Sequence, residues 1–595
     1  MKMKNNILKW SLFMLVFTFI SCETIDLDQV ENPSQPSVDL LDPVYAFNYV
    51  QLQLPDFVNS ANSFTQRVTR QMAMTGGNTY DNAFAPVNSN NNWNIGYNLL
   101  NAVKIMEPKA IVNREYYALG AAKVIRVYVL MTMVDIYGDI PYSEALQGSA
   151  NLTPSFDRSA DIYKGLLLEL DDAIAILNRT DNNSNSEIQD LYYGSQANWV
   201  TLANTLKLKM YCNARLAETD LGVVIKDKIN AILVANNYID QQAEDFQFQY
   251  GNSRFTPNTR HPLYNDQYEL GGGAYIANYM MWAMTTEKKF NLLVGSNGIV
   301  SDPNITYDPR IPFYFCKQVG DPSTLDSFTL PRRIRPDHYN NEEYFSFYYP
   351  SVADDIRTPY LVSNWIGETG ITSNGYLGRD HGDNSGIPPD ADKRTVGGIY
   401  PIGGAYGLTS SVQTGGDKGA LGAGIMPMIL SSYVHFMLAE AALKIPESVS
   451  GTGLTAIGEL EAGIRASIKK TVNFIPNFPY GSNGNSVAPL QSTLLSHEDK
   501  YVTFVKNQYN SAGINQLELI IKEYFIAAWG NGIEPYNAYR RTGYPSNMQP
   551  TLEQASGSYY YTAYYPSDST INNPNAPANM RTKKVFWDKD GLTLH

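Results

Sequence analysis

Apolar residues recur at helical spacing through the first half of the chain. Residues 117–136 are almost continuously apolar, which predicts a buried helix. Residues 161–177 carry apolar side chains at 162, 166, 170, 174 and 177 on one face and acidic side chains on the other, so we expect an amphipathic helix capped by Ser159. A third helix is predicted over 197–216. Because these helices start about 35 to 45 residues apart, the pattern is compatible with divergent helix-pair repeats.

The middle of the chain, from about 245 to 425, has a different pattern. It is rich in Gly, Pro, Asn and Tyr, and we expect one helix near 275–290 with loops and short strands around it. Helical periodicity returns over 426–444, 454–472, 498–508 and 515–529. The pattern therefore predicts a mainly α fold, with a helical scaffold at about 41–244 and 426–545 and a loop-rich region between. Loops this long in a compact domain are usually functional, so we expect this region to face the ligand.

The N-terminus has the pattern of an export signal. Three lysines in the first nine residues precede an apolar run over 10–20. The run is too short to cross a hydrocarbon core of about 30 Å and fits a signal peptide. Ser21 directly before Cys22 resembles a bacterial lipobox, in which Cys22 is lipidated and becomes the new N-terminus. Plain secretion, with Cys22 as an ordinary residue, is the alternative.

The residues after Cys22 read as a tether. Acidic residues at 23, 26 and 28 resemble a signal that sends lipoproteins to the outer cell surface, and the Pro/Asn/Ser segment 32–36 is typical of a linker. We therefore divide the chain into a signal peptide (1–21), a lipidated tether (22–40) and a single domain (41–595). The expected location is the outer membrane, anchored by lipid and facing the exterior.

Composition and motifs exclude several functions. Asp and Glu number 58 against 45 Lys and Arg, a net charge of −13, and no basic block stands out, so nucleic acid is not an expected partner. Three Cys and six His are scattered without ligand spacing, so we expect neither a metal nor a cofactor. The nucleophile-elbow, phosphate-loop and zincin motifs are absent, and we expect no enzyme. A pair of glycosidase carboxylates stays open, because such acids need only be close in space.

One acidic loop, over 378–390, leaves two interpretations open. Its Asp and Asn side chains offer oxygen ligands for calcium, but the spacing is not that of an EF-hand. The same residue types form turns, and a structural turn network is the alternative.

Aromatic clusters are the sharper signal of a ligand. The chain has 42 Tyr, 23 Phe and 7 Trp. One cluster lies over 339–349 and is followed by Trp365, a second surrounds the Asn-rich stretch 88–92, and a third covers 559–565. Sugar rings stack on aromatic faces, and a few placed polar groups complete such sites. The alternative for each residue is packing. The predicted ligand contacts are Tyr80, Trp93, Tyr344, Tyr348 and Trp365.

Several segments together resemble the SusD/RagB family of nutrient-binding outer-membrane lipoproteins. The segment VDIYGDIPYSEAL at 134–146 is very similar to a family motif, and the helix WVTLANTLKLK at 199–209 is similar to another. Further matches follow in order at 153–157, 308–310, 433–442, 531–545 and 584–588. Segment 375–404 resembles an insertion of one branch of the family. Lys207 and Lys209 stand where the family has one or more arginines.

The resemblance implies a scaffold of tetratricopeptide-like helix pairs under a variable, loop-rich face. It also implies a partner, a SusC-like TonB-dependent outer-membrane transporter, which this lipoprotein would cover and supply with nutrient. The expected cargo is an oligosaccharide. Capture of peptides by the same architecture is the alternative, and a surface glycosidase is a remote one. The shared motifs, including Gly138, Pro141 and Arg540–Arg541, have structural duties, so no ligand contact is inferred from them.

Overall fold

The computed structural model describes the greater part of the chain. For Tyr80, Asp81 and residues 365–367 and 370–372 it describes the backbone alone. The described residues are 42–74, 80–183, 188–270, 274–284, 287, 308–316, 365–367, 370–372, 378–379, 381–382, 394–405, 415–474, 495, 497–549, 551, 559–591 and 593–594.

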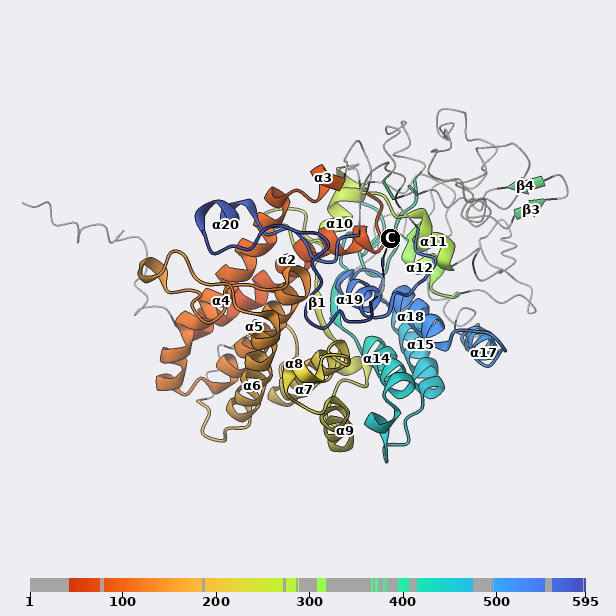
Figure 1. Ribbon diagram of the computed structural model, residues 1–595. Helices are drawn as coiled ribbons and strands as arrows, with labels where there is room; N and C mark the ends of the chain where they lie inside the picture. The colour runs from red at the N-terminus through yellow and green to blue at the C-terminus, as the bar shows by residue number, and fades with distance from the viewer. Residues whose placement is uncertain are drawn as a thin grey trace, which may run out of the picture.

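Long helices form the N-terminal half, and each packs against the next along the chain. Helix α5 lies among the others (Figure 1), and all its residues except Tyr117 and Arg126 are buried. A helix that is apolar all round belongs in an interior, so the predicted buried helix is confirmed. Ser159 begins α6 but does not cap it with its side chain; its backbone N–H donates to the Asp139 carboxylate at 2.8 Å. These helices are α2 (Pro43–Val68), α4 (Pro86–Asn113), α5 (Tyr116–Tyr137), α6 (Ser159–Leu177) and α7 (Gln196–Asn213).

A second group of helices forms the C-terminal half. Helix α14 packs on α15 and α18, and α19 contacts both α2 and α7, so the two halves share one core. The helices predicted over 454–472, 498–508 and 515–529 are confirmed. The members of this group are α14 (Ser431–Lys444), α15 (Ala456–Val472), α17 (Glu498–Tyr509), α18 (Gln516–Ala527) and α19 (Ile533–Thr542).

The start of the helix predicted over 426–444 is wrong. Strand β6 (Ile425–Ile429) occupies this stretch and pairs antiparallel with β1 (Phe246–Gln249), and α14 begins only at Ser431. All five residues of β6 are buried. A short apolar run buried on both sides has the same pattern in a strand and in a helix, so periodicity could not separate them.

Short elements complete the described structure. Helix α11 is the described part of the helix predicted near 275–290. All three sheets in the described residues have two strands, and the predicted mainly α class is confirmed. The remaining elements are α3 (Tyr80–Ala83), α8 (Glu218–Leu221), α9 (Ile225–Ala235), α10 (Pro262–Tyr264), α11 (Asn278–Met284), α12 (Ile311–Tyr314), α20 (Ser567–Asn572), the pair β2 (Phe315–Cys316) and β5 (Val396–Gly397), the pair β3 (Trp365–Gly367) and β4 (Gly370–Thr372), the 3-10 turns η3 (Gly148–Ala150), η4 (Gln242–Glu244) and η8 (Pro446–Val449), and the π-helical turn η5 (Asn265–Glu269).

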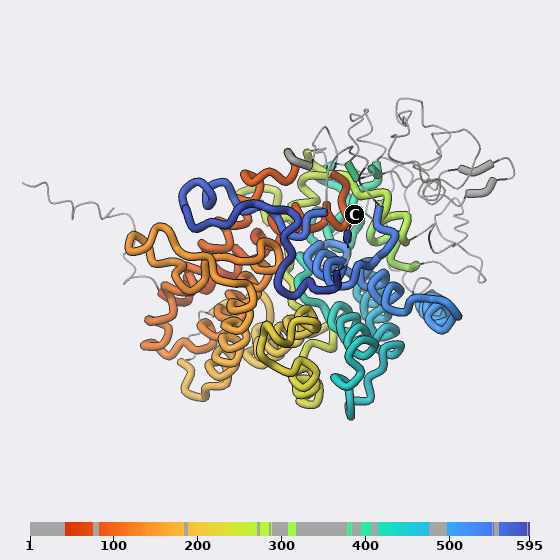
Figure 2. The backbone as a smooth tube through the Cα atoms, in the orientation of Figure 1, coloured from red at the N-terminus to blue at the C-terminus, as the bar shows by residue number. Residues whose placement is uncertain are grey.

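The C-terminal segment returns to the N-terminal helices, as Figure 2 shows. Tyr565 donates to the Asp139 carbonyl oxygen at 2.9 Å, and the indole N–H of Trp587 donates to the Asp135 carboxylate at 3.0 Å. Tyr559, Tyr560, Tyr561 and Tyr565 are all buried. The third aromatic cluster of the sequence therefore packs the core.

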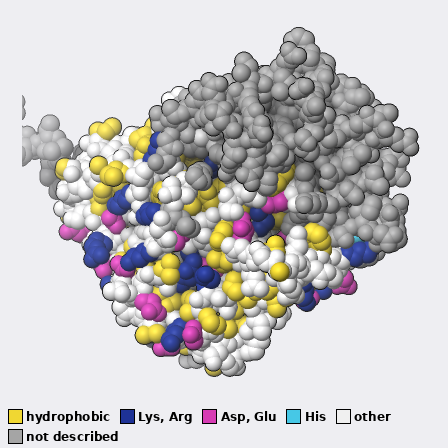
Figure 3. Space-filling model, turned by 45° about the vertical axis from the view of Figure 1, so that its right-hand side comes forward, with side chains coloured by type: hydrophobic (Ala, Val, Ile, Leu, Met, Phe, Trp, Pro, Cys, Tyr) yellow, Lys and Arg dark blue, Asp and Glu magenta, His cyan; other side chains and the backbone are white. Residues whose placement is uncertain are grey.

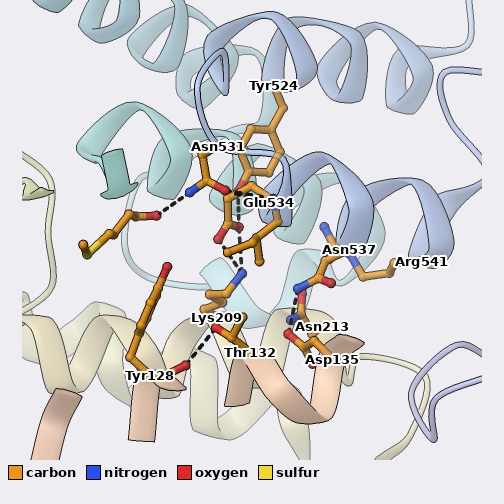
Figure 4. A network of polar contacts seen from close by, with 12 residues as sticks. Tyr128, Thr132, Asp135, Lys209, Asn213, Tyr524, Asn531, Glu534, Asn537 and Arg541 are labelled. Atoms are coloured by element: carbon orange, nitrogen blue, oxygen red, sulfur yellow. Dashed lines mark hydrogen bonds and ion pairs between the residues drawn. The ribbon is translucent and has the colours of Figure 1, made fainter. Parts of the chain in front are cut away.

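Buried polar side chains join the two halves (Figure 4). Lys209 of α7 donates to both carboxylate oxygens of Glu534 at 2.7 Å, and the Tyr524 hydroxyl donates to the same carboxylate at 2.7 Å. Arg541 donates to the Glu440 carboxylate at 2.7 and 2.9 Å. Each of these charges is held by an opposite charge, as buried charges require.

Candidate functional site

Charge alone marks no binding site on the visible surface. On the face shown in Figure 3, basic and acidic side chains of the described residues are interspersed with small apolar areas. A cavity between α2 and η5 is the more informative feature.

The cavity has a volume of about 530 Å³. This lies within the range of roughly 300–1,000 Å³ that is usual for small-molecule sites. Its walls come from the C-terminal part of α2, the segment after it, α10 with η5, a loop at 401–402 and the residues after α18. The lining residues are Asn59, Asn62, Ser63, Gln66, Arg67, Met72, Ala73, Met74, His261, Pro262, Leu263, Asp266, Ala274, Pro401, Ile402, Met426, Trp529 and Gly530.

Backbone hydrogen bonds set the segment that follows α2. The Gln66 carbonyl oxygen accepts from Gln71 at 2.9 Å and Met72 at 3.1 Å, so the chain folds back beside the helix end. Ala73 then donates to the Tyr275 carbonyl oxygen at 2.8 Å. This pairing holds Met72, Ala73 and Met74 as one apolar side of the cavity.

The facing wall begins at His261. Its Nδ1 accepts the Leu263 N–H at 3.1 Å and so caps the short helix α10. Burial lowers the pKa of His261 to about 3, against a weaker effect from a backbone hydrogen bond. The ring is therefore neutral at physiological pH and acts as a structural acceptor rather than as an acid or base.

Asn62 and Gly530 fix the inner end of the cavity. The Asn62 amide donates to the Gly530 carbonyl oxygen at 3.1 Å and accepts the Gly532 N–H at 2.9 Å. Gly530 has φ +94°, and a Cβ there would lie 2.5 Å from a side-chain carbon of Pro401. Only glycine fits this close approach, so the backbone itself forms the wall here.

Two charged groups face the cavity without pairing directly. Arg67 is half-buried; burial lowers the pKa of its guanidinium, and the nearby Asp266 carboxylate partly offsets this. Within the described part of the chain, Arg67 makes no side-chain hydrogen bond or ion pair, and the buried Oδ2 of Asp266 has no hydrogen-bond partner. A buried polar atom without a partner is costly, and a ligand that supplies one would be stabilised here.

Among the predicted ligand contacts, Trp93 alone has a described side chain, and it is not one of the described residues that line this cavity. Trp93 is 8% exposed and packs in α4 against Tyr97 at 4.9 Å and Tyr137 at 5.3 Å between ring centroids. Phe156 and Tyr565 complete its surroundings. These contacts give Trp93 a packing role, so the proposals below do not depend on it.

The other predicted positions fall partly or wholly outside the described structure. Tyr344, Tyr348 and Cys22 lie outside the described residues. Tyr80 begins α3 and Trp365 begins β3, but the structure describes no side chain for either. These residues remain predictions.

Sequence reasoning missed Arg67 and Asp266. They lie about 200 positions apart, and neither belongs to a motif or an aromatic cluster. The nearest signal was general: Asp266, and the cavity residues near 262, 274 and 401, fall in the region predicted to face the ligand.

The described residues contain no cluster of three or more His, Cys, Asp or Glu that could hold a metal ion. Most of the acidic loop over 378–390, including Asp380, Asp383 and Asp390, lies outside the described residues, so the calcium interpretation stays open. Among the described helices, none combines the length and apolar character needed to cross a bilayer.

Two family descriptions match successive parts of the chain. Residues 33–328 match the family described as "Starch-binding associating with outer membrane". Residues 424–582 match the family described as "Susd and RagB outer membrane lipoprotein". No curated protein matches the chain.

Solved structures share the fold. A chitin-binding SusD homologue from Flavobacterium johnsoniae is 17% identical, with 92% of this chain and 98% of that one covered and a TM-score of 0.59. A SusD/RagB family protein from Bacteroides thetaiotaomicron is 17% identical, with 92% and 99% covered and a TM-score of 0.62. A SusD homologue from Bacteroides fragilis is 18% identical, with 92% and 99% covered and a TM-score of 0.59. These likenesses confirm the predicted tetratricopeptide-like helical scaffold.

Proposed function

The chain belongs to the SusD/RagB family, and from this premise we propose that it is a cell-surface lipoprotein that captures oligosaccharides. The captured glycan would pass to a SusC-like TonB-dependent transporter in the outer membrane. Binding, rather than catalysis, is the proposed activity.

The cavity of about 530 Å³ between α2 and η5 carries this proposal. It combines apolar side chains, including Trp529, with amides and two charged groups that lack direct partners among the described residues. Such a mixture suits a sugar, which presents C–H faces and many hydroxyl groups at once. One relative of the same fold is described as chitin-binding, which agrees with a glycan cargo.

The proposed location follows from the N-terminus. Removal of residues 1–21 would leave Cys22 lipidated at the outer membrane, with 22–40 as a tether to the domain over 41–595. A tether of this length leaves the domain room to move over a transporter. The cavity draws on both the helical scaffold and the region 245–425, as a ligand-facing surface would.

The residues of the cavity support binding without turnover. His261 is neutral and used as a cap, and Asp266 is the one carboxylate among the described residues of the lining. Glycoside hydrolysis ordinarily uses two carboxyl groups that flank the bond to be cut. The cavity as described does not supply that pair.

Calorimetric titration of the mature protein in detergent tests the proposal. The ligands would be neutral and acidic oligosaccharides and mixed peptides, with product analysis on every sample. Saturable glycan binding without product is the expected result. Peptide binding alone would replace the cargo, and released product would overturn the assignment as a binding protein. If no ligand binds, the titration is repeated with the transporter present, and failure there would reject the proposal.

A further inference from the structure

The charge inside the cavity differs from that of the whole chain. The chain carries a net −13, yet Arg67 lines the cavity and Asp266 is the only acidic residue among the described residues of the lining. Burial, and then the charges of Arg70 and Arg67, hold the pKa of the buried His381 well below its usual range. The α2 side of the cavity is therefore a local positive site on an acidic protein.

No charged group among the described residues forms an ion pair with Arg67. On the η5 side, Glu269 is already engaged by Arg260 at 3.3 Å and by Arg254 at 3.0 Å. Asp266 is near enough to affect the pKa of Arg67 but forms no ion pair with it in the described structure. A desolvated guanidinium in this state favours an incoming anion. Its planar fork matches a carboxylate with two parallel hydrogen bonds.

Asp266 sets a second requirement for a ligand of this cavity. Its Oδ2 is buried and has no hydrogen-bond partner among the described residues. An ionised carboxylate only accepts hydrogen bonds, so a ligand that meets the Asp266 carboxylate from the cavity has to bring a donor such as a hydroxyl group. The donor must be close to the group that meets Arg67, because both residues line one cavity.

A polar stripe along α2 favours a sugar over a peptide. Asn59, Ser63, Gln66 and Arg67 follow one another at helical spacing, and all four line the cavity. The side-chain amides of Asn59 and Gln66 make no hydrogen bonds with other described residues. They supply both donors and acceptors, which the alternating hydroxyl groups of a sugar ring require.

We propose that this cavity binds a sugar unit that bears a carboxylate, with Arg67 on the carboxylate and Asp266 accepting from a hydroxyl group of the same unit. A uronic acid has both groups on one ring. A neutral sugar would satisfy Asp266 and leave Arg67 without an anion. This inference rests on the proposed function and narrows its cargo to acidic glycans.

The test compares one glycan in two charge states. Oligogalacturonate and its methyl ester are titrated into the full mature protein at low and high salt, together with a peptide that has a free C-terminal carboxylate. We expect the acid form to bind at least about tenfold more tightly than the ester, with a preference that weakens as salt rises. In Arg67→Gln the preference of the protein for the acid over the ester should disappear, because the acid form loses its partner.

Two further variants distinguish binding at this cavity from a general effect of positive charges on the protein. Arg158→Gln removes the same charge at a side chain that is 75% exposed and not part of the cavity, and it should leave the preference intact. Asp266→Ala should weaken both forms, because it removes the acceptor that both use. Thermal unfolding of each variant confirms that it is folded.

Each other outcome contradicts the inference in a distinct way. Equal binding of acid and ester, or an acid preference that survives Arg67→Gln, would overturn it while leaving glycan capture intact. Arg67-dependent binding of the peptide without binding of the acidic sugar would reject the sugar assignment. Failure of every sugar, acidic and neutral, with and without the transporter, would remove the proposed function as well.

Discussion

Two buried regions of this protein use the same kinds of charged side chain in opposite ways. In the network between the helical halves, Glu440 accepts from both Arg541 and Arg215, and Lys209 meets Glu534 at 2.7 Å (Figure 4). In the cavity, Arg67 and Asp266 lie near each other but have no direct partner in the described structure. Paired charges hold the scaffold together, whereas unpaired ones leave interaction energy available to a ligand.

The largest expected effect is the loss of a network carboxylate. Glu440→Ala would leave Arg541 and Arg215 buried without their anion, and we expect the free energy of unfolding to fall by about 3–5 kcal/mol. Urea unfolding followed by circular dichroism measures this. The matched control is Glu461→Ala, at a partly exposed pair with Arg465, which should cost less than about 1 kcal/mol. Equal losses in the two variants would contradict the comparison.

Acid unfolding should depend on the same carboxylate. Burial alone would raise the pKa of Glu440, but Arg541 and Arg215 outweigh burial and lower it from 4.5 to about 2. Because the folded-state pKa lies below the unfolded one, this stabilisation is complete above pH 4.5. It is lost as the pH falls from 4.5 towards 2, and amounts to about 3 kcal/mol.

Comparison of wild type with Glu440→Gln isolates this contribution. The variant cannot titrate at this position, so its free energy of unfolding should vary less with pH between 4.5 and 2 than that of the wild type. Parallel curves over this window would show that Glu440 does not carry the predicted pH dependence.

A smaller effect is expected at the backbone wall of the cavity. In Gly530→Ala the new Cβ meets Pro401 at a positive φ, and we expect a loss of about 1–3 kcal/mol in unfolding free energy. The shifted wall should also weaken glycan binding. Gly513→Ala is the control, since Gly513 has a similar φ of +82° but no atom within 4 Å of its added Cβ. If Gly513→Ala lost as much stability as Gly530→Ala, the positive φ alone would explain the loss, and the contact with Pro401 would not contribute.

The smallest expected effect is at Arg67. Its guanidinium is partly desolvated and makes no ion pair in the described structure, so Arg67→Gln should change the free energy of unfolding by less than about 1 kcal/mol. Thermal unfolding without ligand measures this. A loss near that of Glu440→Ala would mean that Arg67 belongs to the scaffold, and the contrast between the two regions would fail.

Much of the scaffold could be predicted from the sequence because long helices carry their own periodic signal. The buried α5, the amphipathic α6 and the C-terminal helices α15, α17 and α18 all follow from the spacing of apolar residues. The long helices α2 and α4 were not singled out; each contains an internal proline, at Pro55 and Pro108. Proline removes a helical hydrogen bond, so an internal proline in the sequence argues against a helix. In α2 and α4 the helix forms nevertheless, because tertiary packing stabilises it.

The candidate site could not be found in this way. Aromatic clustering pointed to Trp93 and to the tyrosines over 559–565, and the structure places these side chains in packed interiors. Clustering in sequence does not distinguish a ring that packs from one that is exposed to a ligand, because burial depends on elements far away in the chain.

The sequence by itself determined the helices with a clear apolar period, such as α5, α6 and α15, and the ordered motifs that identify its family, because these depend on neighbouring residues. Tertiary structure alone decided that Ile425–Ile429 is a strand, since its partner Phe246–Gln249 is remote. It also decided that Arg67 and Asp266 line the same cavity. In the same way it brought Glu440 into contact with Arg541 of α19 and with Arg215, which follows α7. Whether a buried charge is paired depends on distance in space, which no local pattern encodes.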